Sequence, residues 1–297
     1  MPLIVFLSVV LLQNPSGFTC RWSHGTEIGH VDAPITEDSG LAVSRKYPDR
    51  LYHVNDSGDS GRFFITDFSG RNLRIVNINA FEPKDAEDLA LGPCGLSNDC
   101  VFVGDIGDND RVRKTIELAM VEELKDFPAY VDARYRVRLR YPDGPHDAES
   151  LAVHPDGTIF ILTKGGMPEL FRLRKDQWLN SKGAIQTLEL VARIDFEKLG
   201  GPAAALDGRM PTAMDISADG KRVLVLTYRN VFELLFDLSQ PLPPVGTWKA
   251  GVNYRRIDIE VLNQEEGIAF TPDGRSFIYD TEKPETGPAR IMRSDCR

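Results

Sequence analysis

A short segment recurs five times along the chain and constrains the fold more than any other feature of the sequence. Each copy begins with acidic or small polar residues and ends in a hydrophobic anchor, usually followed by Ala, as in residues 85–90 and 147–152. A repeat at intervals of roughly 50–65 residues is typical of propellers and other modular folds. The anchors are Leu41, Leu89, Leu151, Ile216 and Ile268, and the fourth copy, residues 212–217, is degenerate.

Each copy leads into a turn and a second apolar segment. Asp-Gly turns occur at residues 155–157, 218–221 and 272–275, and Asp-Gly between apolar segments is a strong β-hairpin signal. Third and fourth strands are also readable, and helical periodicity is confined to residues 175–179 and 196–199. Four antiparallel strands per repeat predict the blades of an all-β, five-bladed β-propeller.

Closure of the ring follows from where the last repeat ends. Its third strand is expected near residues 289–292, and residues 26–31, ahead of the first repeat, can supply the missing fourth strand. This N-terminal strand removes the unpaired edges that an open ring would leave. Six blades are the alternative, and they require a further degenerate copy between Ile194 and Thr212.

The four cysteines are Cys20, Cys94, Cys100 and Cys296, and none lies in a CxxC pair, which argues against zinc binding or thioredoxin-like chemistry. Three pairings are possible. We expect Cys94 to pair with Cys100, its near neighbour in sequence, and Cys20 with Cys296 in the closing blade. In the chain-entropy model, a bridge between the chain ends stabilises by roughly 4–5 kcal/mol.

Residues 3–12 form an apolar run that is too short to span a bilayer, which takes about 20 residues. The run suits a signal peptide, although no Lys or Arg precedes it, and a buried N-terminal strand is the alternative. We therefore expect a signal peptide at residues 1–19 and a single propeller domain at residues 20–297. Disulfides behind a signal peptide predict a secreted or periplasmic protein.

The chain has 297 residues, a net charge of −9 and a pI of about 5.2. This charge disfavours nucleic acid and anionic membranes as partners and favours cations as ligands. We expect a monomer whose partner is a small anionic molecule or another protein. The sequence contains no Gly-x-Ser-x-Gly elbow, P-loop or dinucleotide fingerprint.

Polar residues are expected to gather at one mouth of the tunnel, because the first strand of a blade starts where the second ends. Two positions ahead of each anchor, the blades carry Ser39, Glu87, Glu149, Met214 and Glu266, and Thr212 is a possible substitute for Met214. Converging carboxylates repel one another and are costly to desolvate unless a cation binds them. Oxygen-only ligands favour calcium, with magnesium as the alternative, so we predict a calcium site at Ser39, Glu87, Glu149 and Glu266. The alternative is that these groups cap turns or stay solvated at the rim.

A second polar set ends the second strands. Asp56 and Asp105 share a D-x-G-D spacing, and later blades offer Lys164, Tyr228 with Arg229, and Asp280 with Glu282. The loop 105–110 could hold a second cation, although Asp-Gly loops are common turn material. We predict His146 or Asp105 as a general acid or base, and Lys164 and Arg229, together with Arg111, as the groups that hold an anionic substrate.

Residues 86–90 followed by 101–105, with Glu149 and Glu266 in later blades, resemble the calcium-dependent apyrases. The resemblance implies a secreted five-bladed propeller with a central calcium held by Glu and Ser side chains. It does not extend to the substrate-binding residues, so nucleotide hydrolysis is not implied. The turns at 217–220 and 271–274 are similar to those of lactonases and phytase- or esterase-like propellers. Residues 103–109 with 147–151 are similar to bacterial secreted propellers whose activity is largely unassigned.

Three functional hypotheses follow. The first is a calcium-dependent hydrolase of small anionic esters, phosphate esters or lactones at the tunnel mouth. The second is a non-catalytic binding module in which calcium only ties the blades together. The third, a purely structural or adhesive domain, predicts no dependence on cations. A propeller fold by itself does not decide among them.

Overall fold

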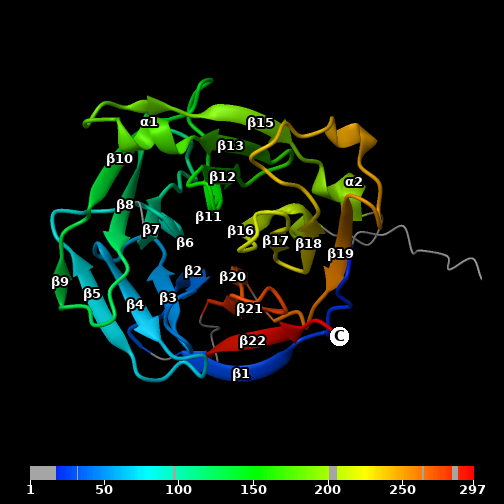
Figure 1. Ribbon diagram of the computed structural model, residues 1–297, viewed down its shortest axis with the longest axis horizontal. Coiled ribbons are helices and arrows are strands. Elements are labelled where there is room, and N and C mark those ends of the chain that lie inside the picture. Colours follow the sequence, from blue (N-terminus) through cyan, green and yellow to red (C-terminus); the bar gives the residue numbers. More distant parts are fainter. Residues whose placement is uncertain (1–17, 32, 96–97, 201–205, 263, 283–286) are drawn as a thin grey trace, which may run out of the picture.

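The computed structural model describes residues 18–297 except 32, 96–97, 201–205, 263 and 283–286, and the predicted signal peptide lies almost entirely outside the described residues. Five antiparallel sheets surround a central axis, which confirms the five-bladed β-propeller (Figure 1). The first strand of every blade lies innermost, and the chain then runs outward strand by strand.

The strands follow the predicted order with one blade per repeat. Two short edge strands, β9 and β14, extend the first two blades in parallel. The strands are, in blade 1, β2 (Asp38–Val43), β3 (Leu51–Asn55), β4 (Arg62–Thr66), β5 (Arg74–Ile78) and β9 (Tyr130–Val131); in blade 2, β6 (Ala86–Pro93), β7 (Asp99–Asp105), β8 (Ile116–Glu122), β10 (Tyr135–Arg140) and β14 (Gln186–Thr187); in blade 3, β11 (Ala148–Val153), β12 (Ile159–Thr163), β13 (Glu169–Leu173) and β15 (Glu189–Arg193); in blade 4, β16 (Pro211–Ile216), β17 (Val223–Thr227), β18 (Asn230–Leu234) and β19 (Tyr254–Asp258); and in blade 5, β20 (Glu265–Phe270), β21 (Ser276–Thr281), β22 (Ala289–Asp295) and β1 (Thr26–Val31).

Helices are short and lie on the periphery. α1 (Lys175–Leu179) and α2 (Phe196–Gly200) occupy the two predicted positions, and two 3₁₀ turns lie at Leu206–Arg209 and Val245–Thr247. The described residues between Ile194 and Thr212 form helix and turn before β16 begins, and the described strands form five blades. No helix among the described residues is long and apolar enough to cross a membrane.

The core consists of five hydrophobic clusters, one between each pair of neighbouring blades. The inner strands are buried on both faces, which explains their nearly continuous apolar sequences. Each blade needs a neighbour on both sides to bury these faces, so the ring is stable only when it is closed.

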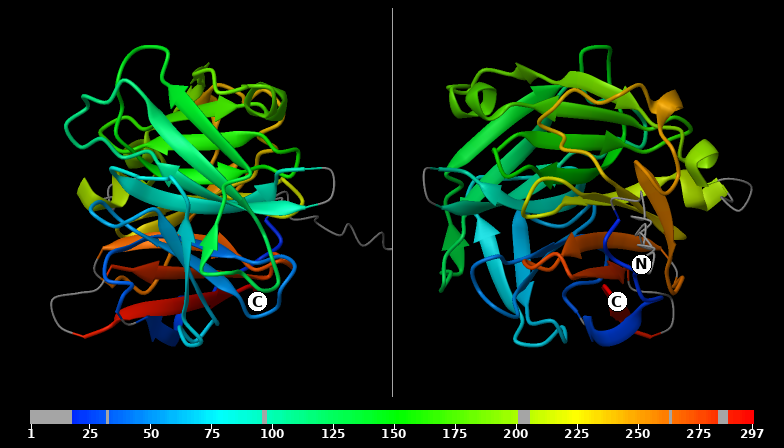
Figure 2. Two further views of the ribbon diagram at one scale, coloured as in Figure 1. Left: turned by 90° about the vertical axis from the view of Figure 1, so that its left-hand side faces the viewer. Right: turned by 45° about the vertical axis from the view of Figure 1, so that its right-hand side comes forward.

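Closure uses the predicted N-terminal strand. β1 pairs antiparallel with β22 as the outermost strand of blade 5, so the first and last strands of the chain lie side by side (Figures 1 and 2). The disulfide Cys20–Cys296 joins the two segments next to this pairing, and Cys94–Cys100 closes the β6–β7 hairpin. Both predicted disulfides are confirmed, and no described cysteine is free.

Candidate cation site at the tunnel mouth

A β-bulge interrupts the pairing of the first two strands at the same place in every blade. The residues that the bulges leave without a paired partner are Ser39, Glu87, Glu149, Thr212 and Glu266. Bulges re-aim side chains and are frequent next to functional sites. We call these five residues the mouth ring.

Thr212 is the blade-4 member of the mouth ring, as the sequence allowed, and Met214 is not. β16 pairs Met214 with Val225, so Met214 takes the anchor position that Leu89 has in blade 2. The expected anchor Ile216 is wrong by two residues. Met214 is buried in the cluster between blades 3 and 4, and the Thr212 Oγ1 atom is buried without a hydrogen-bond partner.

Ser39 and Glu87 link blades 1 and 2 within the ring. The Ser39 hydroxyl donates to Glu87 Oε2 at 3.1 Å, and both residues are buried. Glu87 also belongs to a group of three carboxylates with Asp56 and Asp85, whose oxygen atoms lie within 4.8 Å of one another. We call Asp56, Asp85 and Glu87 the mouth triad.

Burial raises the pKa of Glu87 to about 11, with further contributions from the charges of Glu149, Asp56 and Asp85. Burial also raises the pKa of Asp85 to about 6, and the neighbouring Asp56 adds to this while Arg113 opposes it. Both shifts mean that ionising Glu87 and Asp85 together is costly unless a cation compensates their charge.

The backbone makes room for the mouth triad at Gly107. A Cβ atom at this position would clash with Glu87 Oε1 and with the carboxylate of Asp85. Only glycine lets the β7–β8 loop approach the two carboxylates this closely. The loop therefore forms one wall of a cradle of oxygen atoms.

Lys164 compensates the charge of Glu149, the member of the mouth ring in blade 3. Its ammonium group donates to Glu149 Oε1 at 2.8 Å and to the Tyr228 hydroxyl oxygen at 3.1 Å. Burial raises the pKa of Glu149 to about 7, although the charge and hydrogen bond of Lys164 act to lower it. Burial, Glu149 and Glu282 hold the pKa of Glu266 well above its usual range, and Glu266 Oε2 is buried without a hydrogen-bond partner.

Asp105 is occupied by structural contacts. Its Oδ1 atom accepts the backbone N–H groups of Lys84 and Asp85, and its Oδ2 atom pairs with Arg113. Strand pairing aligns Asp105 with Asn55, one residue before Asp56, so the two D-x-G-D segments are offset by one position. Asn55 likewise accepts the Thr36 N–H.

Asp108 in the loop 105–110 is also held by structural contacts. Asp108 accepts the backbone N–H groups of Val112 and Arg113, and its own N–H donates to Asp147. These contacts match the turn-forming interpretation of the loop, so we do not place a second cation there.

His146 lies outside the mouth ring. Its Nε2 atom lies 2.9 Å from Asp143 Oδ1 and its Nδ1 atom lies 3.4 Å from Glu169 Oε2, so both ring nitrogens face carboxylates. The imidazole also packs against Tyr141 and Phe171. It lines a polar pocket of about 190 Å³ that also contains Arg111, Asp147 and Lys164.

Arg229 is exposed beside Tyr228, and its charge acts to lower the pKa of Glu265. Of the four residues predicted to take part in catalysis, Lys164 therefore contacts the mouth ring directly. The mouth triad adds two residues, Asp56 and Asp85, that were not among the predicted ligands. Asp85 lies two residues before Glu87 in the repeat, and this acidic start of the repeat was the available signal.

No family model and no curated protein matches the chain. Solved structures with similarity to it include PQQ-bound aldose sugar dehydrogenase from Streptomyces coelicolor, with 12% identity over 94% of this chain and 99% of that chain and a TM-score of 0.49. A chain of the nidogen/laminin complex has 12% identity over 85% and 74%, with a TM-score of 0.47. Hydrazine synthase from Kuenenia stuttgartiensis has 11% identity over 89% and 97%, with a TM-score of 0.47. Such identities and TM-scores carry no argument about activity.

Proposed function

We propose that the chain is an extracytoplasmic, calcium-binding β-propeller whose mouth triad, assisted by Ser39, holds the cation. The observation that carries the proposal is the convergence of Asp56, Asp85 and Glu87 from two blades, with Glu87 buried. Lys164 pairs with Glu149, on the third blade. A divalent cation at the mouth triad would remove the cost of ionising its buried carboxylates.

Calcium fits this site better than a transition metal because the ligands are all oxygen atoms. Calcium takes six to eight ligands, so three carboxylates and one hydroxyl leave positions for water or for an anionic ligand. The buried, unpartnered Glu266 Oε2 provides a further oxygen acceptor in the mouth ring. Glu149 would then act electrostatically at the mouth, since its charge acts to raise the pKa of both Glu87 and Glu266.

The activity that we propose for this mouth is hydrolysis of small anionic esters, phosphate esters or lactones. A bound calcium would supply Lewis-acid polarisation of the ester. Lys164 and Arg111 face the adjoining pocket and would hold the anionic group. Glu149, with its pKa raised to about 7 and its contact to Lys164, is suited to act as a general base near neutral pH. His146 is less suited because both of its nitrogens face carboxylates.

A non-catalytic module is the second candidate function, and one observation favours it. The mouth side chains already connect neighbouring blades, since Ser39 reaches Glu87 from blade 1 and Lys164 reaches Tyr228 in blade 4. A calcium ion added to these contacts would strengthen the ring without any reaction. Rim loops would then bind a partner.

An extracytoplasmic location is supported by the two disulfides, because such bonds persist in oxidising compartments. The signal peptide at residues 1–19 remains a prediction. Expression with the leader intact, followed by N-terminal sequencing of the exported product, tests it.

Calcium titration by isothermal calorimetry tests the cation site, together with elemental analysis and thermal melting with and without EGTA. We expect about one calcium per chain and a lower melting temperature after chelation. Glu87→Gln should weaken binding by at least about 100-fold, because it removes a ligand charge from the buried side of the site. Asp143→Asn is the matched control, since Asp143 is a partly exposed carboxylate in the His146 group. Equal binding by wild type and Glu87→Gln would refute the site.

A panel of phosphate esters and lactones separates the enzyme from the module. We expect activity in the calcium-loaded protein that is lost in Glu149→Gln while calcium binding is retained. A protein that binds calcium but turns over none of these substrates favours the non-catalytic module.

A further inference from the structure

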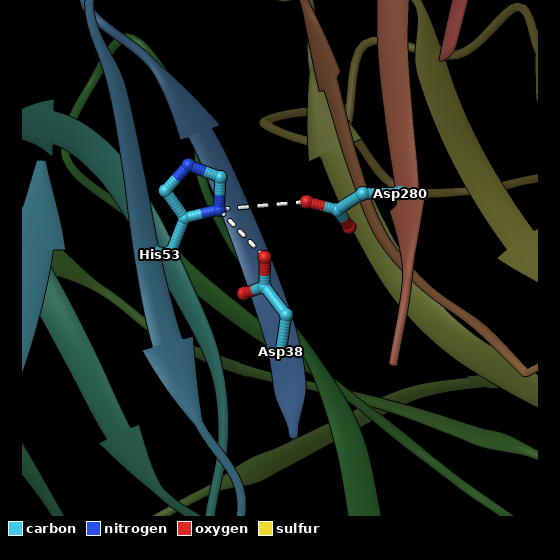
Figure 3. A group of neighbouring side chains, drawn as sticks. All are labelled: Asp38, His53 and Asp280. Carbon is cyan, nitrogen blue, oxygen red and sulfur yellow. Dashed lines mark hydrogen bonds and ion pairs between the residues drawn. The ribbon is translucent and has the colours of Figure 1, made fainter. Parts of the chain in front are cut away.

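Three ionisable side chains meet inside the seam between the last and first blades. Asp38 comes from β2, His53 from β3 and Asp280 from β21, and Figure 3 shows both carboxylates facing the same ring nitrogen of the imidazole. His53 Nδ1 lies 2.6 Å from Asp38 Oδ2 and 3.5 Å from Asp280 Oδ2. All three side chains are 0% exposed. We call them the seam cluster.

The carboxylates of the seam cluster lack the partners that buried carboxylates normally have. Asp38 Oδ1 and both oxygens of Asp280 are buried with no hydrogen-bond partner. Most buried polar groups in proteins are hydrogen-bonded, so three such oxygens around one imidazole require an explanation.

The backbone accommodates the Asp280 carboxylate at a glycine. A Cβ atom at Gly267 would clash with Asp280 Oδ1 and would lie 2.6 Å from the Cβ of Leu41 in blade 1. Gly267 therefore allows both the close packing of the two blades and the position of the carboxylate within the seam.

Charge balance favours a divalent cation over a proton. If His53 is protonated, one positive charge faces two carboxylates, and one negative charge stays uncompensated in the interior unless a carboxyl group is also protonated. A divalent cation balances both carboxylates and gives the unpartnered oxygens a ligand role. Buried charges are normally paired or bound to metal.

The imidazole is held in an orientation that suits metal ligation. His53 Nε2 lies 2.8 Å from Thr66 Oγ1, while Nδ1 faces the two carboxylates. Metal-binding histidines typically donate the N–H of the other ring nitrogen to a nearby acceptor, which fixes the tautomer. Donation from Nε2 to Thr66 leaves the Nδ1 lone pair directed at the seam.

We propose that the seam cluster is a structural metal site in which Asp38, His53 and Asp280 bind a divalent transition metal such as Zn²⁺ or Mn²⁺. One imidazole and two carboxylates form the mixed nitrogen and oxygen ligand set that these metals accept. The ligands come from both ends of the chain, so the site forms only when the ring closes. The metal is loaded during folding and then exchanges slowly, because the site is buried.

The test is metal content after refolding. The disulfide-intact protein is unfolded in guanidinium with EDTA and transferred to metal-free buffer. It is then refolded with Zn²⁺ or Mn²⁺ and dialysed. Elemental mass spectrometry measures the metal that each chain retains. We expect about one equivalent retained by wild type and a loss of at least about tenfold in Asp280→Asn. Asp215→Asn is the matched control, since Asp215 is a partly buried carboxylate outside the cluster that accepts the backbone N–H of Phe270.

Native mass spectrometry of protein expressed in medium supplemented with Zn²⁺ or Mn²⁺ gives the same comparison without refolding, and His53→Gln serves as a second ligand variant. Wild type that retains neither metal by either route, or ligand variants that retain as much as wild type, would overturn the proposal and leave an imidazolium–carboxylate cluster. The calcium site is tested separately, because Glu87→Gln should lose calcium and keep the seam metal.

Discussion

The interfaces between successive blades, which we call the internal seams, and the interface between blades 5 and 1, the closing seam, bury carboxylates in different ways. Asp88 in blade 2 accepts the backbone N–H groups of Leu89 and of Leu151 in blade 3, each at 2.7 Å. In the same manner, Asp215 in blade 4 accepts the N–H of Phe270 in blade 5. In the closing seam, Asp280 has no such donor and lies against His53 and Asp38.

A carboxylate therefore binds the backbone of the next blade directly at some seams, and belongs to a cluster of side chains at the closing seam. At the position where blade 2 has Asp88, blades 1 and 5 have Gly40 and Gly267. Gly40 lies against the backbone and carboxylate of Asp88 between blades 1 and 2, whereas Gly267 lies against Leu41 of blade 1 and leaves space for the Asp280 side chain. The N-terminal strand and the Cys20–Cys296 disulfide therefore complete blade 5, and the seam cluster lies where that blade meets blade 1.

The largest effect is expected from the disulfide that completes blade 5, next to the closing seam. Replacing both Cys20 and Cys296 by Ser should lower the free energy of unfolding by about 4–5 kcal/mol, because this bridge spans 276 residues. The matched control is the double substitution of Cys94 and Cys100, six residues apart, for which about 2 kcal/mol is expected. Guanidinium denaturation measures both. If removing Cys20–Cys296 lowers the free energy of unfolding less than removing Cys94–Cys100, the pairing of β1 with β22 is sufficient to keep blade 5 complete.

Buried carboxylates of the two kinds of seam should lose different amounts of stability on the same substitution. Asp88→Asn places an amide N–H₂ against backbone N–H donors and should cost about 2–3 kcal/mol of unfolding free energy. Asp280→Asn removes an uncompensated charge and should change the stability of the metal-free protein by no more than about 1 kcal/mol. Denaturant unfolding of the metal-free proteins compares them, and equal losses would contradict the distinction between seams.

A pH titration extends the comparison to the mouth. The pKa of Glu87 is raised to about 11 and that of Asp85 to about 6, so in this pH range the calcium-free folded state binds more protons than the unfolded state. Its stability should be highest below about pH 4 for these groups and should fall as the pH rises towards 7. The melting temperature should drop by on the order of 5 °C over this range. Calcium or Glu87→Gln should flatten the slope, and an unchanged slope in Glu87→Gln would argue against this assignment.

The smallest effect is expected at Thr212, the neutral member of the mouth ring. Its hydroxyl is buried without a partner, so Thr212→Val should change stability by less than about 1 kcal/mol. Thr212 is not part of the mouth triad, and calcium affinity should change by less than about threefold. Calorimetric titration checks this, and a large loss of calcium affinity would indicate that the cation lies closer to blade 4 than the mouth triad does.

The repeat and its Asp-Gly turns predicted the blade count, the strand order and both disulfides, because these features are encoded locally or at the chain ends. The register of blade 4 was wrong by two residues. Side chains two apart point to the same face of a strand, so Met214 and Ile216 both satisfy the hydrophobic pattern. Only the pairing with β17 distinguishes them.

The candidate sites were predicted only in part, because some of their residues recur in the repeat and others come together only in the folded ring. Glu87 and Ser39 are periodic in the repeat, whereas Asp56 reaches the mouth triad from the loop of a neighbouring blade. The seam cluster joins residues 38, 53 and 280, and no spacing in the sequence indicates that they touch. The available signal was an ionisable residue, Asp38 or His53, in each of the first two strands of the first repeat.

The Cys20–Cys296 bridge also turns the folded chain into a covalent circle from residue 20 to residue 296. A single cut by a protease in any loop of this circle opens it but releases no fragment, since every peptide stays attached on one side or the other. A nicked molecule would thus keep its mass on a non-reducing gel and would have the connectivity of a circular permutant.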